Sequence, residues 1–416
     1  MESLTLLEHK HIVLAVTGSI ASYKAVDLAS KLTQAGAIVE VIMTDSAQQF
    51  ITPLTFEAVT GQPVYTNLWK AESNGGLPTH IAHVGLGEQT DLLVIVPATA
   101  NTIAKLAHGL ADDLLTVTTL ATRCPILIAP AMDGAMYTHP ATRANLQTLV
   151  ERGVYVVEPE EGRFASGLVG KGRLPDTVVL MGHIRRLLGQ RGNLAGQHVV
   201  VTAGGTRESL DPVRYISNRS SGKQGYSIAQ AALDAGATVT LISSAQHLVA
   251  PIGVELVTVN TALEMERAVL EYSTYADVLV MAAAVADFRP SNIAEQKIKK
   301  TETQGDHLMV ELVRNPDILL EVKAQRQETG FPRVVVGFAA ESENLLGNAK
   351  SKLDRKGLDL LIANDISAND AGFEVDTNRV LLLSLDEGVK QLELRSKVHV
   401  AEAVVERIAV LLEQSN

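Results

Sequence analysis

The sequence is poor in cysteine, in aromatic residues and in long apolar runs, and each shortage excludes a class of protein. Its 416 residues include a single cysteine, Cys124, so an intrachain disulfide is impossible and a cytoplasmic location is expected. Aromatic residues make up only 4%, and the apolar content is mostly Ala, Val, Leu and Ile, which suits buried parallel strands. No apolar run approaches the roughly 20 residues that span a bilayer, so we expect no membrane partner.

Two common nucleotide-binding motifs are also missing. The turns that follow the two opening strands read GSIAS at Gly18–Ser22 and GGTR at Gly204–Arg207, so neither contains G-x-G-x-x-G, and a P-loop is absent as well. This argues against a two-domain nicotinamide dehydrogenase, which needs that glycine fingerprint and a ribose-binding acid about 20 residues later. The net charge of −11 argues against a nucleic-acid partner, although a local basic pocket for phosphates is compatible with it.

One segment is present almost twice. Ala35–Thr44 reads AGAIVEVIMT and Ala235–Ser244 reads AGATVTLISS. Each copy follows a strand with a glycine-rich turn, and each precedes an apolar strand that ends in small residues. This series begins a doubly wound α/β sheet, which binds ligands at the carboxyl ends of its strands. The sequence therefore predicts an α/β protein with two doubly wound, Rossmann-like domains and two ligand sites.

The alternation of aliphatic runs and helical segments places the elements and the boundary. The basic, glycine-rich segment Arg185–Gln197 ends in the predicted linker, which gives domains at 1–190 and 191–416. Helices are predicted near Ala21–Ala35, Lys223–Ala235 and Ala401–Leu412, and a surface loop at Trp69–Thr79. Strands are predicted at His11–Val16, Ile38–Met43, Leu92–Val96, Ile126–Ala129 and Val154–Val157, then at Val199–Ala203, Val278–Ala282, Val334–Phe338, Leu358–Ala363 and Val380–Leu383.

Hydroxyl side chains lie where three strands of the first half should end. These are Ser19, Thr44 and Thr99. Hydroxyls and free amides at helix starts bind anions, so together they suit the phosphate of a mononucleotide such as FMN. Any one of them alone is more often an ordinary helix cap. The convergence of three strand ends favours the phosphate site.

Several longer motifs are more specific. In the first half, three segments resemble the flavin-dependent cysteine decarboxylase family: Pro97–Asn101, Pro130–Tyr137 and Gly170–Leu174. In the second half, four segments resemble phosphopantothenate–cysteine ligase: Asp211–Gly222, Ala282–Asp287, Lys297–Lys300 and Gly337–Glu341. The fused pair, in this order, resembles the bifunctional proteins of bacterial coenzyme A biosynthesis. The likeness covers nearly the whole chain, and its most specific part is Asp211–Gly222.

The resemblance implies two reactions. The ligase half would activate 4′-phosphopantothenate with CTP to an acyl-cytidylate, which L-cysteine attacks while CMP leaves. The decarboxylase half would use FMN to oxidise the cysteinyl thiol, so that CO₂ can depart, and would return the hydride to give 4′-phosphopantetheine. The difficult chemistry belongs to the cofactor, and the protein supplies position and protons.

In the decarboxylase half, the resemblance implies three catalytic residues, of which two depart from the family pattern. His80 matches the catalytic histidine and titrates in the range that proton transfer needs. Asp133 stands where many relatives have Asn, which donates where an ionised Asp only accepts. Ser166 stands where others have a proton-donating Cys, and the proton donor is therefore open. The implied FMN contacts are Gly18, Ser19, Ile20, Thr44, Ala98, Thr99 and Asn101.

Those two departures also support a rival interpretation, in which the first half is a flavin-binding regulatory subunit that has lost catalysis. His80 and the intact ligase motifs oppose it.

In the ligase half, Asn218 matches the residue that positions the acyl-cytidylate, and Arg214 is expected to bind substrate phosphate bidentately.

The CTP site and the partners are likewise implied by the resemblance. Mg²⁺ should accompany the triphosphate, with ligands that the sequence does not identify. The family also implies a homo-oligomer with trimeric decarboxylase contacts and dimeric ligase contacts. The implied CTP contacts are Met281, Ala282, Ala283, Asp287, Lys297, Pro316, Asp317, Ile318, Leu319, Phe338, Lys352 and Lys356.

Overall fold

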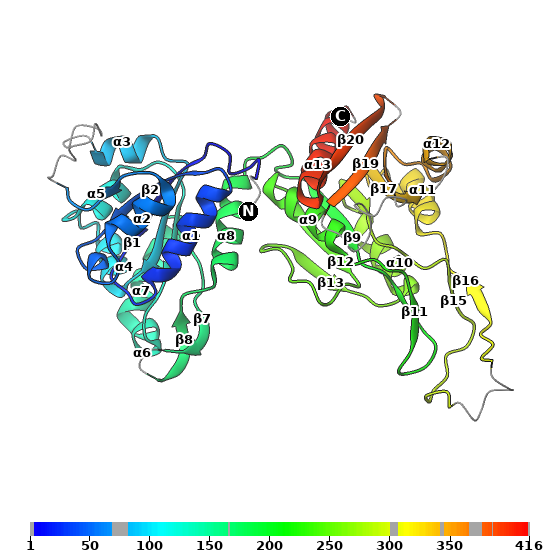
Figure 1. The fold of residues 1–416 in the computed structure, drawn as a ribbon, viewed down its shortest axis with the longest axis horizontal. Helices are drawn as coiled ribbons and strands as arrows, with labels where there is room; N and C mark the ends of the chain where they lie inside the picture. Colours follow the sequence, from blue (N-terminus) through cyan, green and yellow to red (C-terminus); the bar gives the residue numbers. More distant parts are fainter. Residues whose placement is uncertain are drawn as a thin grey trace. The chain divides into compact units, whose positions relative to one another are not determined.

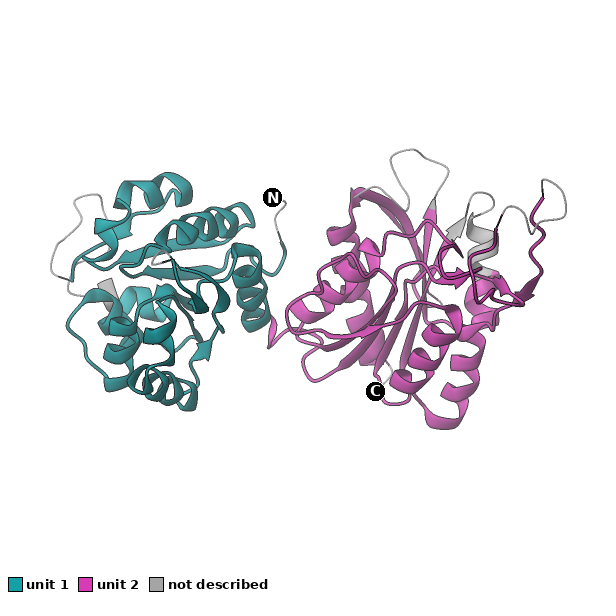
Figure 2. Ribbon diagram, turned by 90° about the horizontal axis from the view of Figure 1, so that it is seen from below, with its two compact units in different colours: residues 1–188 teal, residues 189–416 magenta. Residues whose placement is uncertain are grey.

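The computed structural model describes residues 4–68, 82–164, 167–299, 307–341, 345–365, 377–384 and 386–414. The chain divides into two compact units, residues 1–188 and 189–416 (Figure 2). Each unit is a largely parallel sheet flanked by helices (Figure 1), so the predicted α/β fold with two doubly wound domains is confirmed. Within these ranges every helix is too short or too polar to cross a membrane.

Unit 1 contains a six-stranded main sheet, a separate two-stranded hairpin and helices. Its elements in chain order are β1 (His11–Val16), α1 (Ser22–Gln34), β2 (Ile38–Met43), η1 (Ala47–Gln49), α2 (Pro53–Thr60), β3 (Val64–Tyr65), α3 (Ala82–Glu88), β4 (Leu92–Ala98), α4 (Ala100–His108), α5 (Leu114–Ala121), β5 (Ile126–Pro130), α6 (Gly134–Thr138), α7 (Pro140–Glu151), β6 (Tyr155–Val156), β7 (Glu160–Arg163), β8 (Val169–Arg173) and α8 (Thr177–Gly189).

The main sheet of unit 1 has the order β3-β2-β1-β4-β5-β6, and all its pairs are parallel. The edge strand β3 has two residues; without it the order is that of a flavodoxin-like sheet. Successive strands are added toward one edge from β1 to β3 and toward the other edge from β4 to β6, so the strand order reverses between β1 and β4, and the carboxyl ends of β1, β2 and β4 are neighbours. That edge is where ligands bind in such sheets.

Unit 2 has a larger sheet. Its elements are β9 (His198–Ala203), β10 (Arg207–Ser209), β11 (Tyr215–Ser217), α9 (Lys223–Asp234), β12 (Thr238–Ser243), β13 (Glu255–Thr258), α10 (Ala262–Ser273), β14 (Val278–Met281), β15 (Phe288–Pro290), β16 (Leu312–Arg314), α11 (Ile318–Thr329), β17 (Val334–Glu341), α12 (Leu345–Lys356), β18 (Leu360–Asp365), β19 (Thr377–Ser384), β20 (Gly388–Ser396) and α13 (Lys397–Gln414).

The sheet order in unit 2 is β13-β12-β9-β14-β17-β18-β19-β20, and only the pairs from β18 onward are antiparallel. Alternate side chains of its strands enter two cores. Val199 and Val201 pack with residues of α9 and α13, whereas Val200 between them packs with residues of α10 and α11. Because both faces are covered, the strands are continuous aliphatic runs rather than alternating ones.

The two similar sequence segments lie in equivalent places in the two units, and equivalent hydrogen bonds surround them. His11 and His198 open the first strand of their units, and each donates its backbone N–H to a carboxylate, that of Asp91 or Asp277, at 2.9 and 2.8 Å. Gly36 and Gly236 each follow the C-cap residue of the first helix of their unit, at φ 100° and 93°, a conformation that favours glycine. The similar segments therefore build the same strand–helix–strand start in both units.

A buried lysine joins the two ends of unit 1. The Nζ of Lys24, on α1, donates to the carbonyl of Leu174 at 2.8 Å and to a carboxylate oxygen of Asp176 at 2.7 Å. These acceptors precede α8. A buried ammonium needs such partners, because an uncompensated charge in an apolar interior is costly. Lys24 thus connects α1 to the segment that leads into the last helix of the unit.

The structure also corrects parts of the sequence interpretation. Strands β1 and β2 coincide with their predicted ranges. The segment Arg185–Gln197, which ends in the predicted linker, is helical up to Gly189, where α8 ends. The segment between β9 and α9, where no strand was predicted, contains the β10–β11 hairpin. The predicted loop Trp69–Thr79 lies outside the described residues.

Candidate active sites

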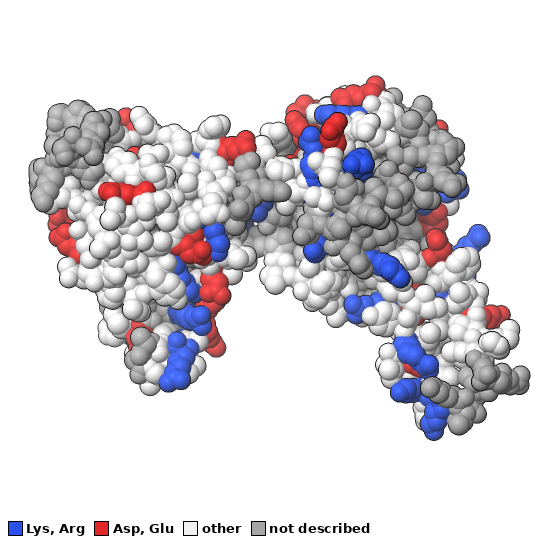
Figure 3. Space-filling view, in the orientation of Figure 1, with Lys and Arg blue, Asp and Glu red and all other residues white. Residues whose placement is uncertain are grey.

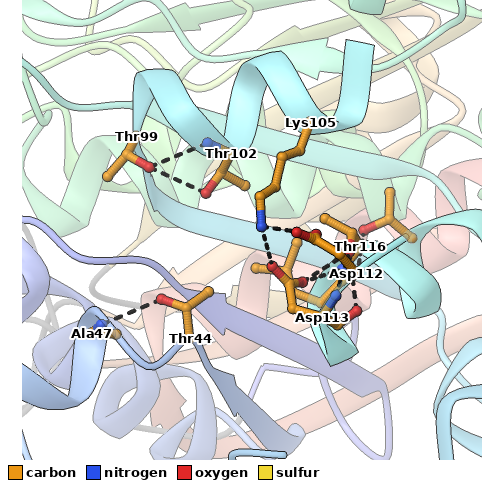
Figure 4. A network of polar contacts seen from close by, with 10 residues as sticks. Thr44, Ala47, Thr99, Thr102, Lys105, Asp112, Asp113 and Thr116 are labelled. Atoms are coloured by element: carbon orange, nitrogen blue, oxygen red, sulfur yellow. Dashed lines mark hydrogen bonds and ion pairs between the residues drawn. The ribbon is translucent and has the colours of Figure 1, made fainter. Parts of the chain in front are cut away.

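Three hydroxyls mark the neighbouring strand ends of unit 1. The Thr17 hydroxyl, just after β1, donates to the Pro97 carbonyl at 2.6 Å and accepts from the Thr99 backbone N–H at 3.1 Å. It therefore holds the ends of β1 and β4 together. Thr99 is also the N-cap of α4, and the Thr44 hydroxyl accepts the N–H of Ala47 at 3.3 Å (Figure 4).

Thr99 therefore caps α4, which is the more ordinary interpretation of such a hydroxyl, whereas Thr44 bonds within the turn that leads into η1, whose own N-cap is Ser46. Capping does not remove an anion site, because the other orphan N–H groups of the same turns remain available to a ligand. Lys105 on α4 forms ion pairs with Asp112 and Asp113 at 2.8 and 3.0 Å, which fixes α4 against the start of α5 (Figure 4).

The predicted FMN contacts fit a phosphate-binding turn. A Cβ on Gly18 would lie 2.5 Å from the Cβ of Ser46, so only glycine permits this close approach of two loops. The hydroxyl of Ser19 accepts the N–H of Ala21 at 3.2 Å, and Ile20 is 65% exposed. Ala98 ends β4 and Asn101 lies in the first turn of α4. This set of small, hydroxyl and amide groups at three adjacent strand ends suits a mononucleotide phosphate.

Asp133 is placed beside the β7–β8 hairpin. It is the N-cap of α6, and its carboxylate accepts the N–H of Ala135 at 3.1 Å. The next residue, Gly134, packs against the ring of Phe164, the residue that follows β7. The hairpin carries charges of both signs, Arg163, Lys171 and Arg173 together with Glu160 and Glu161, and Figure 3 shows blue and red side chains in this part of unit 1. The remaining predicted catalytic residues of this unit, His80 and Ser166, lie outside the described residues.

Three glycines form a cradle for the ring of Phe164. A Cβ on Gly134, Gly170 or Gly172 would come within 3.2–3.4 Å of that ring. A Cβ on Gly172 would also lie 2.3 Å from the backbone oxygen of Met132, which is a steric clash. The glycines of the motif therefore let the hairpin pack closely beside the segment that carries Asp133.

A polar chain anchors the same hairpin. The Tyr137 hydroxyl donates to a carboxylate oxygen of Glu158 at 3.2 Å, and the ammonium of Lys171 lies 2.5 Å from the same oxygen. Burial, reinforced by the negative charge of Glu158, raises the pKa of Tyr137 to about 12. Lys171 in turn lowers the pKa of Glu158. The phenol stays protonated and holds β8 against α6.

Unit 2 contains a cavity of about 1110 Å³ at the carboxyl ends of its parallel strands. We call it the ligase cavity. Most of the predicted ligase residues line it, although they come from distant parts of the sequence. They are Asn218, Met281, Ala282, Ala283, Asp287, Pro316, Asp317, Ile318, Leu319, Phe338, Lys352 and Lys356.

Local bonds position the segment that follows β14. The backbone N–H of Ala283 donates to the Thr202 hydroxyl at 3.0 Å, and that of Ala286 donates to the Thr206 hydroxyl at 3.0 Å. The side-chain amide nitrogen of Asn218 donates to the carbonyls of Ala284 and Val285 at 3.1 and 3.3 Å. The amide oxygen of Asn218 is therefore the group that an incoming ligand can meet.

Two predicted ligase residues do not line the ligase cavity. The guanidinium of Arg214 donates to the buried carboxylate of Asp211 at 2.6 and 3.0 Å and to the Ile298 carbonyl at 2.9 Å. The hydrogen bonds from the Arg214 guanidinium to Asp211 lower the pKa of that carboxyl far below its usual range. Arg214 thus ties its loop to the segment that contains Lys297. Its role as a substrate ligand stays a prediction, as does that of Lys297.

The structure adds cavity residues that the sequence interpretation missed. Asn364, at the end of β18, has a buried amide oxygen without a hydrogen-bond partner among the described protein groups. Asn378 donates to Gln224 at 3.0 Å, and Gln224 donates to the Lys397 carbonyl at 3.2 Å. All four line the cavity. Only Asn364, directly after an aliphatic run, carried a sequence signal, namely its place at a strand end.

Charge in the ligase cavity is arranged for an anionic ligand with a cation. Lys352, Arg355 and Lys356 project from α12, and Lys356 lies 3.2 Å from a carboxylate oxygen of Asp317. Among the described residues, no group of three or more His, Cys, Asp or Glu side chains is arranged to hold a metal ion by itself. A cation here would need oxygen ligands from the bound nucleotide, which is how Mg²⁺ usually binds.

Comparisons with known proteins also divide the chain into two parts. The family described as Flavoprotein matches residues 1–189, and the DNA/pantothenate metabolism flavoprotein C-terminal domain matches residues 194–411. The coenzyme A biosynthesis bifunctional protein CoaBC of Bacillus subtilis is 43% identical over 413 residues, 99% of either chain. That of Vibrio cholerae is 44% identical over 402 residues, which are 97% of this chain and 98% of its own.

A crystal structure of the C-terminal domain of such a bifunctional protein is 34% identical and covers 54% of this chain and 99% of its own, with a TM-score of 0.45. The two family matches together span nearly all of the sequence. The full-length relatives have the same two parts in the same order. The chain therefore belongs to the family of bifunctional coenzyme A biosynthesis proteins, with an N-terminal flavoprotein domain and a C-terminal domain of the pantothenate-metabolism type.

Proposed function

We propose that the chain is a bifunctional enzyme that makes 4′-phosphopantetheine from 4′-phosphopantothenate and L-cysteine. Unit 2 ligates the two substrates at the expense of CTP, and unit 1 decarboxylates the product with FMN. The observation that carries the proposal is the ligase cavity, because every predicted ligase residue except Arg214 and Lys297 lines it. Full-length similarity to bifunctional proteins of coenzyme A biosynthesis supports it.

In the ligase reaction the cavity residues bind, neutralise and orient. The amines of Lys352 and Lys356 and the guanidinium of Arg355 attract the triphosphate, which is released as pyrophosphate. Asp287 and Asp317 are the carboxylates of this cavity that would help to hold Mg²⁺ together with the nucleotide, because Mg²⁺ prefers oxygen ligands. It would neutralise charge on the leaving pyrophosphate.

Nucleotide and acyl group are held by different parts of the same wall. The small residues Ala282 and Ala283 let the backbone approach the base, and Phe338 offers an aromatic face for packing. Asn218 keeps its amide nitrogen on the strand-end carbonyls and presents its oxygen to the acyl-cytidylate. Cysteine then attacks the carbonyl carbon, the tetrahedral centre collapses, and CMP leaves.

In the decarboxylase reaction, FMN supplies a reversible two-electron acceptor for the substrate thiol. The turns at Gly18–Ile20, Thr44 and Ala98–Asn101 would hold its phosphate, supported by their convergence at one edge of the sheet. Because an ionised Asp only accepts hydrogen bonds, either a protonated Asp133 or the backbone N–H groups beside it would orient the substrate carboxylate. The assignment of proton transfer to His80 and of product protonation to Ser166 rests on their motif positions.

The same proposal extends to assembly and location. A homo-oligomer with trimeric decarboxylase contacts and dimeric ligase contacts is supported by the family resemblance. On unit 1, the 65%, 61% and 69% exposure of Ile20, Tyr23 and Leu54 leaves apolar surface that such contacts would cover. The single cysteine is consistent with a cytoplasmic enzyme.

The proposal is tested by incubating the FMN-loaded protein with 4′-phosphopantothenate, cysteine, CTP and Mg²⁺ and by analysing the products by mass spectrometry. We expect 4′-phosphopantetheine, CMP, pyrophosphate and CO₂, with 4′-phosphopantothenoylcysteine as a transient product. Without CTP, neither 4′-phosphopantothenoylcysteine nor 4′-phosphopantetheine should form. Added 4′-phosphopantothenoylcysteine should still be decarboxylated. Absence of the cysteine adduct under saturating conditions would refute the ligase assignment.

A further inference from the structure

A second, smaller cavity of about 280 Å³ lies in unit 2 beside the ligase cavity. It is formed where the β10–β11 hairpin meets the loop after β12. The two cavities share one wall, the segment Asn218–Ser221. The small cavity is lined by Gly205, Arg207, Tyr215, Ser217, Asn218, Arg219, Ser220, Ser221, Ser244, Ala245 and His247.

The chemistry of this lining is one-sided. It contains two arginines, a histidine and several hydroxyl groups, and none of the described residues that line it is acidic. The whole chain, in contrast, carries a net charge of −11. Neither Arg207 nor Arg219 forms an ion pair with a described carboxylate. A basic concavity in an acidic protein is complementary to an anion.

The hairpin orients one of these cations in advance. Arg207 on β10 is the register partner of Ser217, and Tyr215 lies two residues before Ser217 on β11. That diagonal places the guanidinium carbon of Arg207 5.2 Å from the centre of the Tyr215 ring, a cation–π contact. The stacked guanidinium keeps its N–H fork for a second partner, and such a fork matches the oxygens of a phosphate.

Close packing also fixes Gly205 and Ser244, which line the small cavity. A Cβ on Gly205 would lie 2.8 Å from the carbonyl oxygen of Asn218, so the two loops are in contact. The Ser244 hydroxyl donates to the Gly205 carbonyl at 2.9 Å. Backbone groups in direct contact therefore form part of this cavity, and its volume of about 280 Å³ suits a phosphoryl group rather than a whole nucleotide.

We propose that this small cavity is a phosphate-binding subsite of the ligase, in which Arg207 and Arg219 hold a phosphoryl group of a substrate whose reacting end lies in the ligase cavity. The inference rests on the proposed ligase function and adds to it. Both CTP and 4′-phosphopantothenate carry phosphoryl groups, and the chemistry of the lining is the same for either. The shared wall Asn218–Ser221 allows one substrate to reach both cavities.

The test compares Arg207→Gln and Arg219→Gln with the control Arg395→Gln, which removes an exposed arginine of β20 that lines neither cavity. The KM for CTP and the KM for 4′-phosphopantothenate are measured separately in the ligase reaction. A charge-assisted hydrogen bond is worth about a ten- to hundredfold change in binding. We expect a rise of that size in one of the two KM values, with kcat within about threefold and decarboxylation unchanged.

The substrate whose KM rises identifies the phosphoryl group that the subsite holds. Arg219 is exposed, so its replacement should fold normally, and its result stands even if Arg207→Gln is unstable. If both KM values of a folded Arg219→Gln enzyme stay within twofold of wild type, the subsite is refuted. If the wild-type protein makes no cysteine adduct, the proposed ligase function itself fails instead.

Discussion

Replacing Asn218 with Asp should stall the ligase between its two half-reactions. Asn218 keeps its place through two hydrogen bonds from its amide nitrogen, to the carbonyls of Ala284 and Val285 at 3.1 and 3.3 Å. A carboxylate cannot donate these bonds, and it would bring a negative oxygen toward two carbonyl oxygens. Formation of the cytidylate depends more on CTP, Mg²⁺ and the lysines of α12, so it should be less affected.

The size of the effect follows from the bonds that are lost. Each neutral hydrogen bond contributes about 0.5–1.5 kcal/mol net, so the loss of two amounts to about 1–3 kcal/mol. If this positions the acyl-cytidylate for attack, the rate of cysteine addition should fall roughly five- to 150-fold. Repulsion by the carboxylate moves the expected value toward the upper end. Asn218→Ala loses the same bonds without the charge and should show the smaller loss.

The assay separates the half-reactions. Pyrophosphate release is followed without cysteine, and adduct formation is followed by rapid quench after cysteine is added. For Asn218→Asp we expect pyrophosphate release near the wild-type rate and slow adduct formation. Equal loss of both steps would contradict the reasoning, because it would mean that Asn218 holds phosphopantothenate or the loop as a whole.

Three further predictions address unit 1 and the loop around Asp211. His80→Asn should abolish CO₂ release and leave ligation intact; equal loss of both activities in a folded, FMN-loaded variant would contradict the role given to His80. Gly172→Ala should displace the β7–β8 hairpin, because its Cβ would lie 2.3 Å from the Met132 oxygen. Its decarboxylation rate and thermal midpoint should both fall. Gly153→Ala, at φ 85° with open space around it, should cost only the backbone strain of about 1–2 kcal/mol; equal behaviour of the two variants would rule out the clash. The lowered pKa of Asp211 contributes stability that is complete above the ordinary carboxyl pKa near 4 and is lost as the pH falls toward the lower folded-state value. The difference in thermal midpoint between wild type and Asp211→Asn should therefore narrow between pH 6 and pH 3, and a difference independent of pH would show that the carboxylate charge is not what stabilises the loop.

Much of the fold could be predicted because the parallel strands are buried on both faces. Such strands are continuous aliphatic runs, and β1 and β2 coincide with the predicted ranges. The β10–β11 hairpin could not be found in this way. Its strands have three residues each, Tyr215–Ser217 is exposed, and no apolar periodicity marks it. Tertiary contacts with the strand-end loops, rather than local preference, place it.

The residues of the candidate sites also fall into those that could be predicted from the sequence and those that could not. Residues within long motifs, such as Asn218 and Asp287, could be predicted, and both line the ligase cavity. Asn364 and Lys397 reach that cavity only because β18 and α13 fold against distant segments, and a single polar residue near an element's end carries little information by itself. Arg214 shows the converse, since its motif position did not reveal that Asp211 already binds its guanidinium.

The buried ammonium of Lys24 has a consequence for how the protein is made. Its acceptors at Leu174 and Asp176 lie about 150 residues later in the chain. During synthesis, α1 emerges from the ribosome long before these partners exist, so its lysine must stay in water until they arrive. Unit 1 can therefore complete its native packing only when nearly all of it has been translated, shortly before the first strand of unit 2 follows. Arrest of translation ahead of Asp176 should leave a nascent flavoprotein unit that is incompletely closed and open to proteases.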